Sequence, residues 1–576
     1  MITKAYRTFV RLSVFSLASL FLVSCSDFFD PSTDDEFDGE KGYTTTTEMS
    51  TGFLGILAKV QAVGDKEILL TEPRGELIEP SEQSNSELIA LYNYDSNLQE
   101  NSYANPKGYY EVVIACNDYL KQMEKYKSNP NVDTELWNAF VASALRVKVW
   151  VYKTLGEIYG EAIWFDDAAD QTTELKLGDK FQKMDMQQLT DKCLSLLESG
   201  YEGVDLKTEV DWVTLMDPDN ISSPASSTYY YWNSNIPHYP GLLAELLLWK
   251  AAYLDAAGED TKSLYKEAAD VLLAAVNKYI NDQSTSGNPG YWIPSTPIAG
   301  KYSRFWDNTT PYRQEGVTAI TYNYQTNQTN TLLKHFSNEF PNKYWLRPSV
   351  AGMERYIDNT FNPGTAKNHA RYTSTFGNRE SETPYIAKFR PVGSSYRSEA
   401  YQDDVHIYIY RAMQYHLMII EALNHLMRFE AMEICLNNGF AAFQPEVFET
   451  DKTGEYEGFN RNWTKQAEWG NRSYAHAGIR GQYTLSARNV KTNIYELGKE
   501  KTLHYNDMQI LDEVMLEFGC EGKVYPWMNR MAVRYNDPSI VADRVCPKYT
   551  DEALAASVRE KIMDGGYWVK YDLGIE

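Results

Sequence analysis

The sequence is short of positive charge. Its 576 residues hold 55 lysines and arginines against 79 aspartates and glutamates, a formal net charge of -24. Proteins bind phosphate backbones through clustered lysine and arginine, and no such cluster stands out here, so we expect no nucleic acid among the partners. The same acidity argues against electrostatic docking on anionic lipid. A membrane contact would therefore need another source.

Catalytic and metal-binding motifs are also missing. The eight histidines are scattered, and neither a His-Glu-x-x-His nor a Cys-x-x-Cys sequence occurs. The adjacent carboxylates Asp166-Asp167 and Asp403-Asp404 are interpreted as solvated turn residues, because a glycosidase dyad is assembled across a fold at about 5–10 Å. We expect no metal, no cofactor and no enzymatic activity, with a surface glycoside hydrolase as the minor alternative.

Cysteine is rare, and its spacing is irregular. One of the six cysteines, Cys25, belongs to the N-terminal signal described below. The other five are odd in number and widely separated, which favours small buried apolar residues over a disulfide framework or a zinc site. They are Cys116, Cys193, Cys435, Cys520 and Cys546.

The first residues form a lipoprotein signal. Lys4, Arg7 and Arg11 are followed by an apolar run from Leu12 to Val23 and then by Cys25. A transmembrane helix needs about 20 residues, so this shorter run is typical of a cleaved signal peptide. We expect Cys25 to be acylated and to be the first residue of the mature chain. Two or three acyl chains anchor stably, since each buried methylene contributes about 0.8 kcal/mol.

Three parts are expected along the chain. Residues 1–24 are the signal peptide, and residues 25–42 are an acidic tether too polar to bury a core. No Pro/Gly/Ser-rich linker or charge block divides residues 43–576, which we interpret as one large domain.

The strongly periodic segments predict helices in about four pairs. Short polar turns such as Asn129-Pro130-Asn131 separate the two helices of a pair, and Asn437-Asn438-Gly439 is a strong helix stop. The spacing of alanines near a period of 34 residues is typical of tetratricopeptide-like pairs. The predicted pairs are Tyr109–Tyr126 with Leu136–Tyr159, Gly241–Ala257 with Ser263–Ile280, Asp404–Met427 with Phe429–Leu436, and Asp507–Phe518 with Val524–Arg534.

Aromatic residues are frequent, and many fall in long irregular stretches. The chain has 43 tyrosines, 22 phenylalanines and 13 tryptophans. Tyrosine and tryptophan combine an apolar face with a polar tip, so their excess indicates aromatic groups in ligand grooves as well as in cores. Long loops inside a compact chain are usually functional. The stretches are Glu202–Tyr239, Asn281–Tyr324 and Phe440–Thr502.

Several separated segments together resemble the SusD/RagB family. The start of the mature chain is similar to the family's start, one helix ends in a Tyr-Gly corner before an exposed aromatic turn, and two later helices carry patterns similar to "YR…LM…AEALN" and "ILDE…E…EGxR…R". Val524-Tyr525 and the C-terminal Tyr567–Asp572 depart from the family pattern. The matching segments are Cys25–Asp30, Ala144–Asp166, His406–Arg411 with Glu421–Asn424, and Ile510–Glu513 with Glu517, Glu521–Lys523 and Arg530.

This resemblance implies a mostly α fold, a tetratricopeptide-like superhelix of about four helix pairs with long irregular ligand-binding loops. It also implies an outer-membrane lipoprotein facing the cell surface. Such a protein captures a nutrient and acts as a hinged lid on a TonB-dependent (SusC/RagA-like) transporter. Relatives of the SusD type suggest an oligosaccharide as ligand, and those of the RagB type a peptide; the aromatic loops favour the oligosaccharide.

In family members, early loops and a mid-chain loop supply the binding face, so three stretches are expected to form the site. Within them, Trp306 would stack on a sugar ring, Arg304 and Asn93 would donate hydrogen bonds, and Glu76 would accept them. The stretches are Thr71–Pro80 with Arg74 and Glu76, Leu91–Asp95 with Tyr92 and Asn93, and Tyr291–Tyr312 with Trp292, Tyr302, Arg304 and Trp306.

Overall fold

The computed structural model describes residues 42–166, 182–224, 227–282, 316–360, 370–389, 402–437, 479–480 and 485–572. Among these residues no helix is both long and apolar enough to cross a bilayer. The helices are α2 (Thr46–Gln61), α3 (Lys66–Thr71), α4 (Ser86–Tyr92), α5 (Lys107–Tyr126), α6 (Thr134–Tyr159), α8 (Met186–Ser199), α9 (Trp212–Met216), α10 (Tyr239–Ala256), α11 (Lys262–Asp282), α13 (Leu332–Phe336), α14 (Val350–Asp358), α15 (Ala370–Thr375), α16 (Ala412–His425), α17 (Phe429–Asn437), α20 (Lys499–Phe518), α21 (Val524–Tyr535), α22 (Ser539–Val545) and α23 (Glu552–Lys561).

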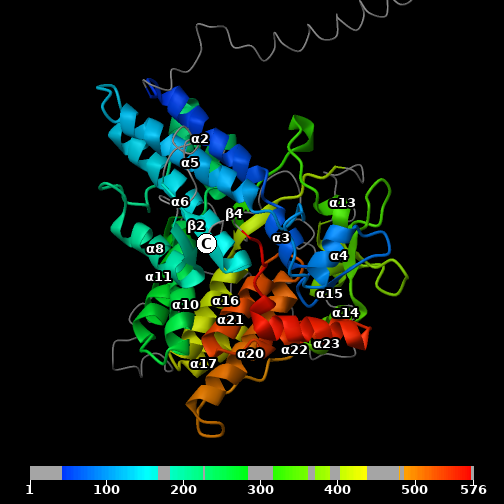
Figure 1. Ribbon diagram of the computed structural model, residues 1–576. Coiled ribbons are helices and arrows are strands. Elements are labelled where there is room, and N and C mark those ends of the chain that lie inside the picture. Colours follow the sequence, from blue (N-terminus) through cyan, green and yellow to red (C-terminus); the bar gives the residue numbers. More distant parts are fainter. Residues whose placement is uncertain are drawn as a thin grey trace, which may run out of the picture.

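Short antiparallel strand pairs lie between the helices. Figure 1 shows the long helices α2, α5, α6, α8, α10 and α11 on one side, and the short helices α3, α4 and α13 to α15 on the other. The strand pairs are β1 (Ile78–Pro80) with β5 (Leu346–Pro348), β2 (Glu161–Trp164) with β3 (Gln182–Asp185), β4 (Gly316–Ile320) with β8 (Ile407–Arg411), and β6 (Phe376–Gly377) with β7 (Tyr385–Ile386).

The predicted helix pairs are confirmed. α5 packs on α6, α10 on α11, α16 on α17 and α20 on α21. The pairs are joined into one scaffold, because α6 and α10 both contact α8, α11 contacts α16, and α16 contacts α20. The alanines that suggested helix pairing, among them Ala251, Ala268 and Ala422, are buried. The expected helical superstructure is therefore present.

Helix α6 is the central helix of this scaffold. Its N-cap residue Asp133 accepts a hydrogen bond from the backbone N–H of Leu136, and Gly160 ends the helix with a φ of +74°. Every side chain from Ala139 to Tyr159 is buried. A helix that is buried on all sides is surrounded by other elements. The candidate site lies at the C-terminal end of α6.

One predicted helix begins too early. The segment Asp404–Met427 was expected to be helical throughout, but Ile407–Arg411 forms strand β8, paired with β4 from Gly316 to Ile320. Its β-branched and aromatic residues favour a strand. All five strand residues are buried, so the alternation that would have revealed a strand is absent.

Two local expectations are wrong and one is confirmed. Asp404 is not solvated: it is 1% exposed and accepts a hydrogen bond from the Tyr324 backbone N–H at 3.1 Å. The aromatic turn after Gly160 is not exposed either, because Trp164 is buried and stacks on Tyr152 with 4.1 Å between ring centroids. The five cysteines after Cys25 are buried and unpaired, as their spacing suggested.

A buried carboxylate on α20 holds three arginines. Glu513 is 0% exposed, and its two oxygens lie 2.7 Å from Arg371 Nη2, 2.7 Å from Arg480 Nη1 and 3.1 Å from Arg488 Nε. Burial alone would raise the pKa of Glu513, but the three guanidinium charges outweigh it and hold the pKa well below its usual range. Arg371 lies in the short helix α15, whereas Arg480 and Arg488 lie in the stretch that precedes α20, so Glu513 fixes the positions of all three.

The next turns of the chain continue this ionic network. Arg411 at the end of β8 lies 3.0 Å from Glu517 Oε1 and 2.9 Å from Glu521 Oε2. Lys388 donates to Glu521 Oε1 at 2.7 Å. All four side chains are buried, so strand β8 and the segment around Lys388 are attached to α20 by charge as well as by packing.

We expect Glu513→Gln to lower the free energy of unfolding by about 3–5 kcal/mol, because removing one partner of a buried ionic cluster leaves uncompensated charge in the core. Glu500→Gln is the matched control, since Glu500 lies in the exposed first turn of the same helix and should cost less than about 1 kcal/mol. Denaturant unfolding measures both. Equal stability of the two variants would contradict this role of Glu513.

Candidate functional site

A cleft of about 420 Å³ lies where the C-terminal segment crosses the end of α6. Figure 1 shows this segment returning from α23 to the middle of the molecule, beside β2. Three parts of the chain that are far apart in sequence line the cleft, which we call the C-terminal cleft. Its lining residues are Ser96, Asn97, Gln99, Tyr159, Gly160, Glu161, Trp568, Val569, Lys570, Tyr571 and Asp572.

Side chains and backbone groups hold the C-terminal segment against the other two walls. The Val569 N–H donates to the carbonyl of Ile158 at 2.9 Å. Gln99 bonds the backbone of Asp572 twice, donating to its carbonyl at 2.9 Å and accepting from its N–H at 2.8 Å. The segment has no regular secondary structure here, so these bonds replace a helix or a strand ladder.

The cleft's tryptophan lies against a glycine. A Cβ added to Gly160 would come within 2.8 Å of the indole ring of Trp568, which is closer than real Cβ atoms approach. The ring centroid of the buried Trp249 is 6.1 Å from that of Trp568. Trp568 thus packs near Gly160 and Trp249 and remains partly exposed at the cleft.

Aromatic faces and hydrogen-bonding groups meet in the cleft. Trp568 and Tyr571 are partly exposed, and the exposed Ser96 and Asn97 make no side-chain hydrogen bond within the described part of the chain. Glu161 forms an ion pair with Lys183, with 2.9 Å between Oε1 and Nζ. Flat ring faces beside amides, hydroxyls and carboxylates can bind a ligand that has both apolar faces and many hydroxyls.

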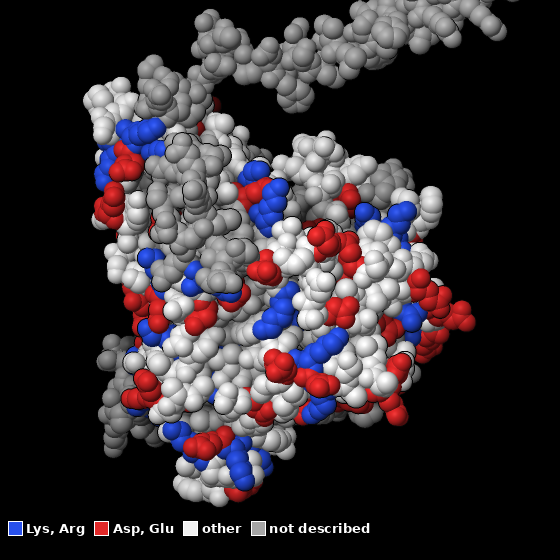
Figure 2. All heavy atoms as spheres, viewed as in Figure 1, with Lys and Arg blue, Asp and Glu red and all other residues white. Residues whose placement is uncertain are grey.

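The surface around the cleft has mixed charge. Figure 2 shows acidic and basic side chains interspersed on the described part of this face. Within the described residues, no group of three or more histidine, cysteine, aspartate or glutamate side chains could hold a metal ion.

The whole fold is similar to several solved structures. A SusD homolog from Bacteroides thetaiotaomicron superposes with a TM-score of 0.58 at 11% identity, covering 93% of this chain and 98% of its own. A laminarin-binding SusD-like protein gives a TM-score of 0.55 at 12% identity, covering 89% and 96%. For NanU of Bacteroides fragilis the TM-score is 0.54 at 16% identity, covering 90% and 94%.

The chain has the SusD-like fold. No family model and no curated protein matches its sequence. Identities of 11 to 16% show a shared fold, so the role of each residue has to be argued from this chain's own geometry.

Two of the residues expected at the site lie inside the SusD-like fold. Arg74 is 1% exposed and donates to the carbonyls of Gly566 and Trp568. Glu76 is 3% exposed, and its carboxylate lies 2.9 Å from Arg544 Nη2 and 2.7 Å from Arg355 Nε. In this arrangement neither side chain reaches the surface to meet a ligand.

Two other expected residues lie at the surface, in the segment that precedes the cleft residues Ser96 and Asn97. The ring centroid of the partly exposed Tyr92 is 4.6 Å from that of Tyr549, and burial raises the pKa of the Tyr92 hydroxyl. Asn93 is also partly exposed, and its carbonyl accepts from Lys561 at 2.8 Å. Both precede the cleft residue Ser96 by a few positions and stay predictions.

The remaining expected residues fall outside the described part of the chain. They are Cys25 at the N-terminus and Trp292, Tyr302, Arg304 and Trp306 in the loop Tyr291–Tyr312.

Sequence reasoning missed the cleft residues themselves. The C-terminal Tyr567–Asp572 did show a signal, because it has three aromatic residues, Tyr567, Trp568 and Tyr571, after the last helix. Its partners Asn97 and Gln99 lie more than 400 residues earlier, and nothing in the sequence links the two segments.

We expect Gly160→Ala to displace the Trp568 ring, because the added methyl group would overlap the indole. Gly258→Ala is the matched control: Gly258 has the same φ of +74°, and its added Cβ meets nothing within 4 Å. Both variants carry the backbone cost of a positive φ, about 1 kcal/mol. Only Gly160→Ala should alter the tryptophan signals in near-ultraviolet circular dichroism. Identical spectra for the two variants would show that Gly160 does not position the ring.

Proposed function

We propose that this chain is a cell-surface lipoprotein that captures oligosaccharides in the C-terminal cleft and delivers them to a TonB-dependent outer-membrane transporter. The observation that carries the capture step is the partly exposed Trp568 ring, fixed on Gly160 and surrounded by amide and hydroxyl groups. Sugar rings present apolar C–H faces that stack on such a ring, while their hydroxyls bond the polar neighbours. The similarity to a laminarin-binding SusD-like protein supports a carbohydrate ligand.

Residues beyond the cleft complete the proposal. Tyr92 and Asn93 would extend the surface along the segment that enters the cleft, and Trp306, with Trp292, Tyr302 and Arg304, would add a second platform. Arg74 and Glu76 would act through the fold, because both side chains are buried and bind interior groups, the carbonyls of residues 566 and 568 and the guanidinium of Arg544.

The chain would bind its ligand without transforming it. The cleft's carboxylates Glu161 and Asp572 are the groups that a hydrolase would need to use, and Glu161 is already paired with Lys183. Incubation with candidate polysaccharides should therefore release no new reducing ends.

We expect Trp568→Ala to weaken oligosaccharide binding about tenfold, since loss of one stacked aromatic ring costs on the order of 1–2 kcal/mol. Calorimetry of the unacylated Cys25→Ser protein against neutral and acidic oligosaccharides and a mixed peptide digest measures this directly. Trp232→Ala is the control, because Trp232 is a partly buried tryptophan outside the cleft.

Three outcomes separate the alternatives. Unchanged glycan affinity in Trp568→Ala would remove the C-terminal cleft from the site. Binding of peptides with no response to any oligosaccharide would favour the peptide-uptake alternative. Release of reducing ends would favour the hydrolase.

Location and delivery are tested separately. We expect the wild-type protein to partition with outer membranes and Cys25→Ser to be soluble, because the acyl anchor is the proposed membrane contact. Gentle solubilisation and affinity capture of the wild type should recover a TonB-dependent barrel protein in near-equal amount. Membrane partitioning of Cys25→Ser would contradict the anchor, and recovery of the protein alone would contradict the transporter complex.

A further inference from the structure

Three consecutive carbonyls beside the cleft are all bonded by side chains from elsewhere in the chain. Arg74 Nη2 donates to the carbonyl of Gly566 and, at 3.3 Å, to that of Trp568. The carbonyl between them, that of Tyr567, accepts from the hydroxyl of Tyr525 at 2.7 Å. We call this set of bonds the carbonyl clamp. The clamp fixes the backbone before and at Trp568. The hydrogen bond between the Val569 N–H and the Ile158 carbonyl fixes the backbone after it.

The arginine of the clamp is itself fixed. Its guanidinium carbon lies 3.9 Å from the ring centroid of Tyr94 and 5.9 Å from that of Tyr525. In the described part of the chain no carboxylate forms an ion pair with Arg74, so ring faces and carbonyl dipoles balance its charge. The hydrogen bonds of this guanidinium to the C-terminal segment go to the backbone carbonyls of Gly566 and Trp568.

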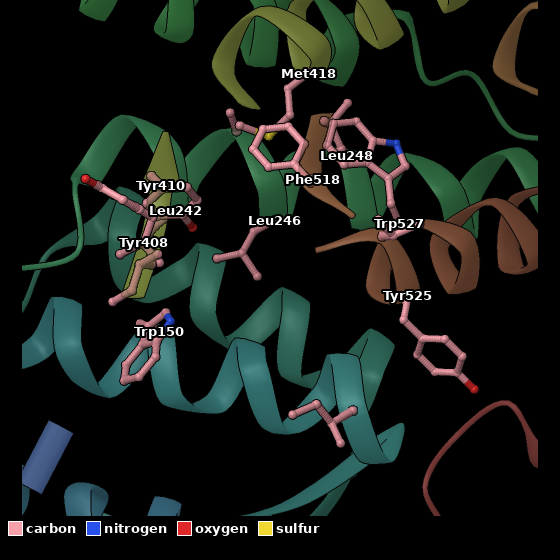
Figure 3. Packing of buried hydrophobic residues seen from close by; sticks show 14 of the residues in the cluster. Trp150, Leu242, Leu246, Leu248, Tyr408, Tyr410, Met418, Phe518, Tyr525 and Trp527 are labelled. Atoms are coloured by element: carbon pink, nitrogen blue, oxygen red, sulfur yellow. The ribbon is translucent and has the colours of Figure 1, made fainter. Parts of the chain in front are cut away.

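The tyrosine of the clamp belongs to the rigid scaffold. Tyr525 is 2% exposed and lies in the first turn of α21. Figure 3 shows it at the edge of the core, with its hydroxyl pointing away from the labelled apolar side chains. The hydroxyl can therefore reach the C-terminal segment while the ring stays in the core.

Val524-Tyr525 and Tyr567–Asp572 are also the two places where the sequence departs from the SusD/RagB pattern. A segment without regular structure loses conformational freedom when a ligand orders it, and ordering it beforehand removes that cost from binding. We propose that Arg74 and Tyr525 are positioning residues for ligand capture, which hold Trp568 in its binding orientation without touching the ligand. This inference rests on the proposed function of the C-terminal cleft.

The test removes one hydroxyl. Tyr525→Phe keeps the ring in the core and removes the hydroxyl that bonds the Tyr567 carbonyl, and we expect it to weaken oligosaccharide binding about fivefold. Tyr322→Phe is the matched control, because the Tyr322 hydroxyl also donates to a backbone carbonyl, that of Gln61 at 2.7 Å, away from the cleft. Its affinity should equal that of the wild type.

A double-mutant cycle distinguishes positioning from general destabilisation. If Tyr525 acts through the indole, Tyr525→Phe should have no further effect on affinity in the Trp568→Ala background. An equal loss in both backgrounds, or no loss in either, would overturn the proposal. Arg74→Met should weaken binding more than Arg74→Lys, because an ammonium can still donate to one of the two carbonyls.

Hydrogen exchange gives a readout that needs no ligand. The backbone N–H of Val569 should exchange faster in Tyr525→Phe than in the wild type, and at an unchanged rate in Tyr322→Phe. If no oligosaccharide binds the wild type, the proposed function fails while this measurement still tests the clamp. Unchanged exchange in Tyr525→Phe would show that the clamp does not order the segment.

Discussion

The charge of Glu513 constrains much of this fold. A carboxylate with no solvent around it is stable only if cations meet it, and three arginines from the segments at 371, 480 and 488 do so. These segments contribute little regular structure of their own. Their position therefore depends on the ion pairs with Glu513 on α20.

Buried polar contacts also connect the end of α20 and the region after it to the early loop that contains Arg74. The N–H of Gly522, just beyond α20, donates to Glu72 Oε1 at 2.7 Å, and burial raises the pKa of Glu72 to about 7. Lys548 donates to the carbonyls of Pro73, Gly75 and Ile78, and burial lowers its pKa to about 7. The early loop that contains Arg74 is thus fixed by the last hundred residues of the chain, and Arg74 in turn fixes the C-terminal segment. The early loop around Arg74 and the C-terminal segment therefore support each other, and the cleft that this segment lines depends on tertiary contacts.

This arrangement separates residues that face the cleft from residues that hold its wall. Trp568, Tyr571 and Asn97 present ring faces and an amide to the cleft. Arg74 and Tyr525 use a guanidinium and a phenol inside the protein, where they bond backbone carbonyls. Residue type is therefore a poor guide to which role a side chain has, since an arginine or a tyrosine can bond a backbone carbonyl as readily as a ligand hydroxyl.

The sequence by itself determined the helix pairs, because apolar periodicity and helix stops are local, and it determined that the cysteines are buried, because their spacing allows little else. It also placed the motif carboxylates Glu513, Glu517 and Glu521 together near the C-terminus, without showing that they are buried. Only the tertiary structure decided that Ile407–Arg411 is a strand, since its partner β4 lies about ninety residues earlier and a strand buried on both faces shows no alternation. It also decided the cleft, because hydrogen bonds between Gln99 and Asp572 join positions separated by 473 residues, and no local pattern carries that information.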